Sequence, residues 1–196
     1  MKKLLAIALF FIPFFAFSQT TKPIDGFLGI KFGSTKQQVI AAIKARGGIL
    51  GKAAPGANAL GFSKVTLARR QSEALLVKFI DGKAFNARFI FKPQDDYHAI
   101  EYYEDLIKDF NSVYGKGEST KKYTSPASES DQNQMADLLV GSAEYSTYWD
   151  AADKNFIGLF IIKDDENNLI ISLSYVDSAL SDKANAQQES KDKSDL

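Results

Sequence analysis

His98 is the only histidine in this chain of 196 residues, and the chain contains no cysteine. A general base, a histidine-containing metal site or a serine–histidine triad would therefore have to use this one side chain. His98 stands at the start of a predicted helix, and the sequence has no G-x-S-x-G nucleophile elbow. A catalytic or ligating imidazole stays open as an alternative, but the pattern favours an exposed or helix-capping histidine. We expect no catalytic residues, no metal and no cofactor.

Acidic side chains gather in two places, and both patterns are typical of exposed structure. Asp164-Asp165-Glu166 lies between two predicted strands, where Asp favours turns, and it lacks the alternating ligands and central glycine of a calcium loop. Four more follow the exposed side of a predicted helix: Glu101, Glu104, Asp105 and Asp109. A hydrolase that used carboxylates alone would need two of them in a cleft, roughly 5–10 Å apart.

Tyrosine and tryptophan are more numerous than a small core requires, at positions 97, 102, 103, 145, 148 and 149. Their apolar bodies and polar tips suit surfaces that recognise sugars or peptides. Ordinary half-buried sheet packing explains the same residues and is favoured.

The first eighteen residues predict a signal peptide. Lys2 and Lys3 give residues 1–3 a positive charge, and residues 4–17 are apolar. Ala16 and Ser18 are small residues at the two positions that a signal peptidase recognises. Cleavage before Gln19 follows. An uncleaved anchor is the alternative, but a span needs about 20 apolar residues. Without cysteine no lipid can be attached at the cleavage site, so we expect an exported protein, periplasmic or extracellular, with no stable membrane anchor.

Charge and cysteine content restrict the partners. Without Lys2 and Lys3, 22 of the 24 basic residues remain against 24 acidic ones, a net charge of about −2. This balance gives no reason to expect nucleic acid as a partner. Since no disulfide is possible, stability must come from a hydrophobic core.

A short strand at residues 27–30 is expected to lead into a helix at 35–46. Gly33 closes the strand, Ser34 is the expected N-cap, and Gln37 completes a capping-box pattern. A bound anion at this helix start is conceivable, but a cap is favoured.

Three strands are expected next, at 61–68, 74–80 and 85–91, with a type I′ turn at Asp81-Gly82. Alternation places one set of side chains on one face of the last two strands: Leu75, Val77, Phe79, Phe85, Ala87, Phe89 and Phe91. A second helix is expected at about 97–114, because its apolar positions recur every three or four residues.

The polar stretch 116–134 is interpreted as a mobile connection, since it is too poor in apolar residues to fold alone. Strands are expected at 144–149, 156–163 and 169–176, and residues 178–196 are predicted to be a disordered tail.

These elements predict a single α+β domain at 19–177. A helix followed by three strands occurs twice, and two such halves joined edge to edge would form one antiparallel sheet with both helices on one face. The opposite face would then carry a mixed apolar and basic set, Leu76, Lys78, Ile80, Arg88, Ile90 and Tyr148. Such a surface is unusual to leave bare, so these residues are the candidate binding site.

The motif Phe32-Gly33-Ser34-Thr35-x-x-x-Val39, between a strand and a helix that ends in glycine, resembles small exported bacterial domains built from helix-plus-sheet repeats. SmpA/OmlA-like outer-membrane assembly lipoproteins and β-lactamase-inhibitor-like proteins are the families in question. The chain departs from the first because it has no cysteine to anchor, and from the second because it has no disulfide. The resemblance implies a non-catalytic, protein-binding role in the cell envelope and transfers no functional residue.

We therefore expect an exported, non-enzymatic protein that binds an envelope protein or polymer through the sheet face away from its helices. A carboxylate-dependent hydrolase of envelope polymers is the first alternative. A small-ligand carrier is the second, and it would need an apolar pocket of several hundred Å³.

Overall fold

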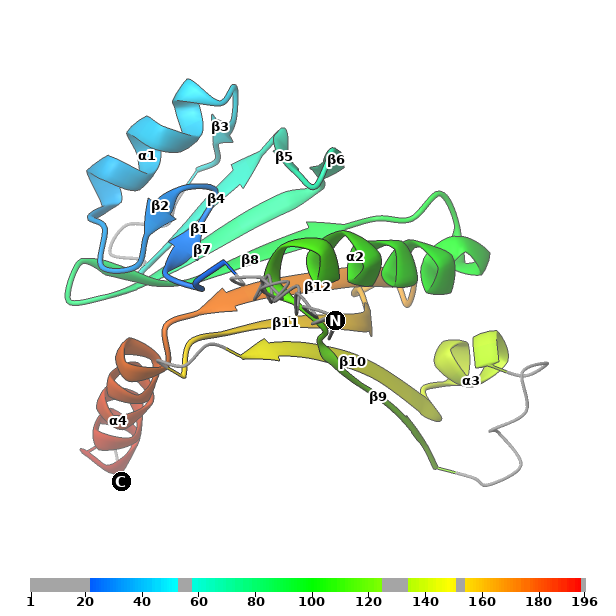
Figure 1. The fold of residues 1–196 in the computed structure, drawn as a ribbon. Helices are drawn as coiled ribbons and strands as arrows, with labels where there is room; N and C mark the ends of the chain where they lie inside the picture. Colours follow the sequence, from blue (N-terminus) through cyan, green and yellow to red (C-terminus); the bar gives the residue numbers. More distant parts are fainter. Residues whose placement is uncertain (1–21, 53–57, 125–133, 151–153, 195–196) are drawn as a thin grey trace, which may run out of the picture.

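The computed structural model describes residues 22–52, 58–124, 134–150 and 154–194 (Figure 1). The predicted signal peptide lies outside these residues. The structure confirms the α+β class and a large antiparallel sheet.

Eight strands form that sheet, and each pairs with its neighbours in antiparallel fashion. In spatial order they are β3 (Ile49–Leu50), β4 (Ala59–Ser63), β7 (Ala74–Ile80), β8 (Lys83–Phe91), β12 (Leu169–Val176), β11 (Phe156–Lys163), β10 (Ala143–Asp150) and β9 (Glu118–Tyr123). The two central strands, β8 and β12, are joined in the register Phe89 opposite Leu173. All eight residues of β12 are buried, as expected for a central strand.

Two small hairpins stand apart from the sheet. One joins β1 (Gly26–Phe27) to β2 (Ile30–Lys31), and the other joins β5 (Val65–Leu67) to β6 (Arg70–Ser72). The predicted strand 61–68 is therefore wrong as one element. Lys64 has a φ of 56°, and this left-handed backbone separates β4 from β5.

Helix α1 (Lys36–Ala45) confirms the first predicted helix, but not its cap. Thr35, rather than Ser34, is the N-cap: its hydroxyl accepts from the backbone N–H of Gln38, and the Gln38 side chain accepts from the Thr35 N–H. The capping box is thus shifted by one residue, because the chain at Ser34 still follows the turn that begins at Lys31.

Helix α2 (Ala99–Tyr114) follows a single 3₁₀ turn at Asp96–His98 and packs against β11 and β12. Tyr103, Leu106 and Phe110 of α2 share one continuous core with Val39 and Ile43 of α1. Both helices therefore cover the same face of the sheet, which Figure 1 shows as the upper face.

The predicted alternation in β8 is wrong at Phe85. A bulge shifts the register, so that Lys78 lies opposite Asn86 but Phe79 lies opposite Ala84. The extra residue in β8 reverses the alternation. Ala84 joins the core, while Phe85 lies on the opposite face beside the C-terminal helix.

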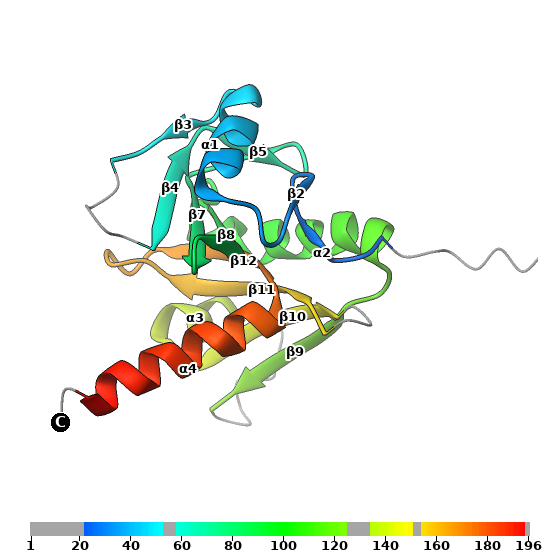
Figure 2. The ribbon, with the colours of Figure 1, turned by 90° about the vertical axis from the view of Figure 1, so that its left-hand side faces the viewer.

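The tail predicted to be disordered forms helix α4 (Ser178–Ser194), which packs against β7 and β8. Asp177 starts it by accepting from the Leu180 N–H, and the following Ala, Lys, Gln and Glu residues are good helix formers. Lys183 pairs with Asp81 at 2.6 Å, so the helix is also tied to the β7–β8 turn. Figures 1 and 2 show α4 leaving the sheet on the side away from α1 and α2.

The connection predicted to be mobile also contains regular structure. Its first part is the edge strand β9, and α3 (Gln134–Val140) follows at its end, with Leu138 in the core. Residues 125–133 lie outside the described part of the chain.

Candidate functional site

One row of side chains crosses the sheet on the face away from α1 and α2, here called the open face. The strand registers place Leu76 opposite Arg88, and Arg88 opposite Ser174. Ser174 lies opposite Gly158, which in turn lies opposite Tyr148. The row therefore brings three of the six predicted site residues, Leu76, Arg88 and Tyr148, onto one line across five strands.

The other predicted residues flank this row, with one exception. Ile90 lies in the next row, opposite Ser172, and is half-buried, and Lys78 lies on the other side and is exposed. Ile80 is only 7 % exposed, near the contact of α4 with β7, so it does not contribute to an exposed surface. The open face thus has exposed side chains on β7, β8 and β10, buried Ser172 and Ser174 between them on β12, and the chain's own helix at one end.

Aromatic rings lie together on the β10 and β11 part of this face. The Tyr148 ring meets Phe160 at a centroid distance of 5.4 Å and Phe156 at 6.1 Å. Gly158 makes this packing possible, because a Cβ there would lie 2.8 Å from the Phe160 ring and 3.4 Å from the Tyr148 ring. Phe160 was not among the predicted residues, although the alternation of β11 places it on this face.

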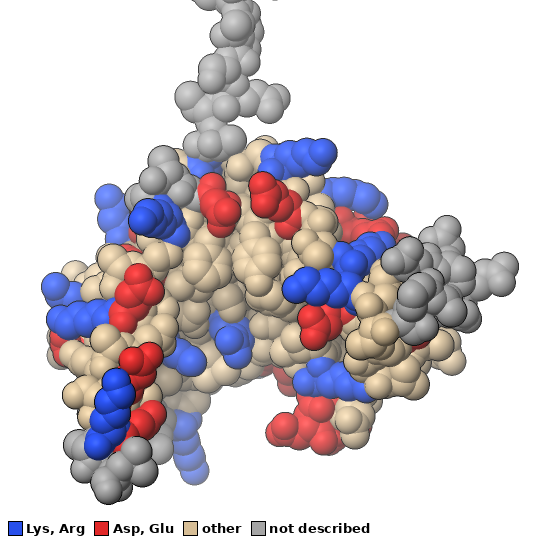
Figure 3. Space-filling view, turned by 90° about the horizontal axis from the view of Figure 1, so that it is seen from below, with Lys and Arg blue, Asp and Glu red and all other residues tan. Residues whose placement is uncertain are grey.

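A cation lies in the same row as Tyr148, three strands away. Arg88 is exposed, and its Nε donates to the Ser174 hydroxyl at 3.3 Å. Exposed Leu76 and Tyr148, 41 % and 38 % exposed, stand on either side in the row. Figure 3 looks onto this face and shows a mainly uncharged middle, with acidic and basic side chains around it. Such a surface can bury apolar area around one guanidinium.

Comparison of the chain with protein-family models, with curated proteins and with solved structures finds no match in any of the three. The site must be interpreted from its own geometry. In the described ranges, no helix is both long enough and apolar enough to cross a bilayer.

His98 lies in a turn rather than in a cleft. Its Nδ1 is 2.7 Å from the Asp95 carboxylate, and both side chains are about half exposed. The hydrogen bond to Asp95 raises the pKa of His98, and the same bond lowers the pKa of Asp95. This pair, together with the backbone bond from the His98 N–H to Asp95, stabilises the turn that starts α2.

The acidic clusters have partners of ordinary structural kinds. Asp164 accepts from the backbone N–H groups of Glu166 and Asn168, as in a turn. Asp105 pairs with Lys108 along α2. Within the described residues, no group of three or more His, Asp or Glu side chains is placed to hold a metal ion.

The six Tyr and Trp side chains divide between core and surface. Tyr103, Tyr145 and Trp149 are buried, whereas Tyr97 is 79 % exposed. The Tyr103 hydroxyl lies 2.6 Å from that of Thr147, and burial raises the pKa of Tyr103 to about 12. Most of these residues therefore belong to sheet packing, and Tyr148 is the one that joins the candidate site.

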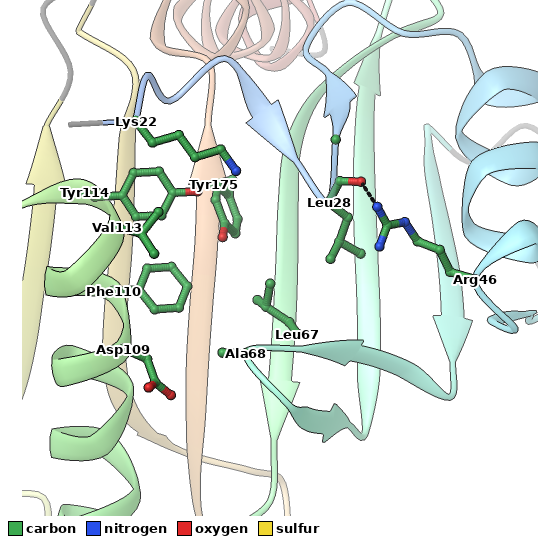
Figure 4. A pocket seen from close by; sticks show the side chains of 11 residues that line it. Lys22, Leu28, Arg46, Leu67, Ala68, Asp109, Phe110, Val113, Tyr114 and Tyr175 are labelled. Atoms are coloured by element: carbon green, nitrogen blue, oxygen red, sulfur yellow. Dashed lines mark hydrogen bonds between the residues drawn. The ribbon is translucent and has the colours of Figure 1, made fainter. Parts of the chain in front are cut away.

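A second feature, not predicted from the sequence, is a pocket of about 420 Å³ on the helix-covered side (Figure 4). Phe110, Val113 and Tyr114 of α2 form one wall, and Tyr175 of β12 lies at the floor. Burial raises the pKa of Tyr175 well above its usual range.

The remaining walls of this pocket come from the two small hairpins. Leu28 and Gly29 form the turn between β1 and β2, and in the other hairpin Leu67 ends β5 and Ala68 lies in the turn. These segments are far apart in sequence, and no short sequence motif predicts that they come together.

Proposed function

We propose that this protein is an exported, non-enzymatic binding protein of the bacterial cell envelope, and that it contacts a partner protein or envelope polymer through its open face. The observation that carries the proposal is the row that sets exposed Leu76, Arg88 and Tyr148 on one line across the sheet, with Leu76 next to Arg88 and with Ser174 and Gly158 between Arg88 and Tyr148. Aromatic residues and arginine are the usual anchors of protein interfaces, because they combine a large apolar area with directed hydrogen bonds.

The chemistry of the face favours a partner with a mixed surface. Tyr148 and Phe160 offer ring faces and edges, and Arg88 offers guanidinium N–H groups beyond the Nε that bonds to Ser174. A partner that buries an apolar side chain against the rings and brings a carboxylate to Arg88 would satisfy both. Nucleic acid is not favoured, since the chain has no net positive charge.

The export part of this proposal rests on residues 1–18. Their positive start, apolar run and small residues at 16 and 18 are those of a signal peptide, and the absence of cysteine leaves no lipid anchor at the cleavage site. The resemblance to envelope domains built from helix-plus-sheet repeats supports the same compartment.

The proposed division into two halves is supported by the strand order. The first four strands of the sheet follow α1 and lie on one side of the β8–β12 junction, and the last four follow α2 and lie on the other. Each half would contribute four strands to the sheet, rather than three.

Site-specific photo-crosslinking tests the binding proposal. A photoreactive phenylalanine derivative replaces Tyr148 in one variant and Tyr97 in a matched control, since both tyrosines are exposed but only Tyr148 lies on the open face. Each variant is incubated with an envelope fraction and irradiated. We expect a discrete crosslinked product from position 148 and none from position 97.

A second substitution connects the product to the face. Arg88→Glu in the Tyr148 variant should abolish the product, because it reverses the charge in the row that ends at position 148, whereas Lys108→Glu on the exposed side of α2 should leave it unchanged. Equal crosslinking from positions 97 and 148, or a product that survives Arg88→Glu, would show that the open face is not the contact surface.

A further inference from the structure

The pocket of Figure 4 has the size and lining of a small-ligand site. Its volume of about 420 Å³ lies within the range of roughly 300–1,000 Å³ that is typical of such sites. Leu28, Leu67, Phe110 and Val113 supply an apolar lining, with Tyr175 at the floor. A ligand would therefore place an apolar body in this pocket.

Two hairpin turns hold the wall opposite α2 in a set conformation. Leu28 has a φ of 49° and Gly29 one of 76°, and Ala68 and Arg69 have φ values of 48° and 62°. A left-handed backbone is costly for leucine, and such strain persists where the surroundings fix it, often at ligand-binding sites. Here Arg46 fixes it by donating from Nη2 to the Leu28 carbonyl at 2.8 Å.

The charges around the pocket are unequal. Lys22 and Arg46 reach its edge from opposite sides, and the Lys22 ammonium lies 5.8 Å from the Tyr114 ring centroid. The one carboxylate in the lining, Asp109, is already engaged by Arg69 at 3.3 Å and by Arg70 at closer range. Two cationic side chains, Lys22 and Arg46, therefore line an apolar cavity whose one carboxylate is already paired with arginines outside the lining.

We propose that this pocket binds a small amphipathic carboxylate, with the apolar body against Phe110 and Tyr175 and the carboxylate between Lys22 and Arg46. The backbone N–H of Lys22 bonds to the Val113 carbonyl, which positions the lysine beside α2. Arg46 uses one nitrogen for Leu28, and the other donors of its guanidinium suit a carboxylate. This site lies on the opposite side of the sheet from the open face and does not depend on it.

Calorimetric titration of the full chain with octanoate tests the proposal, with octanol as the uncharged probe of the same length. The single tryptophan gives a second readout, since Trp149 packs on Phe110 at 5.4 Å between ring centroids. We expect saturable binding of octanoate and a change in tryptophan fluorescence at the same concentrations.

Matched variants distinguish the contribution of the two cationic side chains from that of the apolar cavity. Lys22→Gln should weaken octanoate binding about tenfold, the equivalent of about 1.4 kcal/mol for one charge-assisted hydrogen bond, without changing octanol binding. Arg46→Gln should weaken octanoate binding at least as much, because it also releases the Leu28 carbonyl. Lys31→Gln and Lys44→Gln, which remove exposed lysines outside the lining, should change neither. Val113→Trp, at a position 44 % exposed, should fill the pocket and abolish both.

Octanoate that fails to saturate, or binds equally well to the Lys22→Gln, Arg46→Gln double variant, would overturn the proposal. So would octanol binding as tightly as octanoate. None of these results bears on the crosslinks from Tyr148, so the two proposals fail independently.

Discussion

The rings of Tyr148 and Phe160 meet edge to face, with centroids 5.4 Å apart and an interplanar angle of 83°. Both rings lie against Gly158, which has no side chain to keep them apart. Edge-to-face pairs of this kind contribute about 0.5–1.5 kcal/mol beyond their buried area. A glycine in the middle of β11 thus shapes the surface that we propose to be the binding site.

Gly158→Ala should disturb this surface. The new Cβ would lie 2.8 Å from the Phe160 ring, so the ring must turn away from Tyr148, at a cost of about 1 kcal/mol in the free energy of unfolding. Urea unfolding measures the cost. Gly61→Ala is the control, because its Cβ would meet no atom within 4 Å, and it should be neutral or slightly stabilising. Equal effects of the two substitutions would contradict the proposed role of Gly158.

Thr35→Ala should lower the free energy of unfolding by about 1 kcal/mol, because it removes the hydroxyl that accepts from the Gln38 N–H. Ser34→Ala, one residue earlier, should have a much smaller effect. Thermal and urea unfolding of the two variants decide between the caps, and the reverse order of stabilities would place the helix start at Ser34 after all.

The buried tyrosines should make the fold sensitive to alkali. The folded-state pKa of Tyr103 is about 12, above the ordinary value of about 10, so the unfolded chain loses this proton first as pH rises. The stability associated with Tyr103 is complete below about pH 10 and is lost between about pH 10 and 12.

Tyr103→Phe should therefore be less stable than the parent at neutral pH, since the hydrogen bond to Thr147 is lost, and should lose less stability at high pH. Urea unfolding at about pH 8 and pH 11 measures both effects. Tyr97→Phe, at an exposed position, should leave the pH profile of the parent unchanged. If the free energy of unfolding of Tyr103→Phe fell with pH as steeply as that of the parent, the loss of stability could not be attributed to Tyr103.

His98 can be titrated without ambiguity, because it is the only histidine. Its bond to Asp95 raises its pKa, so proton NMR should give a value above the ordinary 6.5, and Asp95→Asn should lower it. The stabilisation from this pair is lost as pH falls through the lowered pKa of Asp95; at the other end it is complete below about pH 6.5 and is lost as pH rises through the raised pKa of His98. Asp105→Asn is the control on the same helix. An unchanged His98 pKa in the Asp95→Asn variant would refute the pairing.

Regular alternation allowed most of the sheet to be predicted. Tyr145, Thr147 and Trp149 alternate along the strand predicted at 144–149, and all three are buried. The strands 74–80, 156–163 and 169–176 were predicted with the bounds that the structure gives. A two-residue period is a local property, so the sequence of each strand is sufficient to reveal it.

Features that depend on distant contacts were not predictable in this way. Helix α4 packs on strands that precede it by about a hundred residues. The bulge at Phe85 lies within the local β7–β8 hairpin, but the alternation of apolar residues continues through it and gives no sign of the shift. Leu76, Arg88 and Tyr148 lie in one row because of how neighbouring strands pair, and the sequence of a single strand does not reveal that pairing. The pocket depends on turns at Leu28 and Ala68 that adopt left-handed backbone without a glycine at those positions.

The pairing of β8 with β12 also affects how the chain can fold. Arg88 and Ser174, bonded across this junction, are 86 residues apart in sequence. Contacts of such high sequence separation slow folding, because the entropy of closing a long loop is lost before the free energy of the contacts is gained. During synthesis, the aromatic edge of β8 must stay unpaired until the last strand has been made. A nascent chain that stops before residue 169 would expose this edge to self-association.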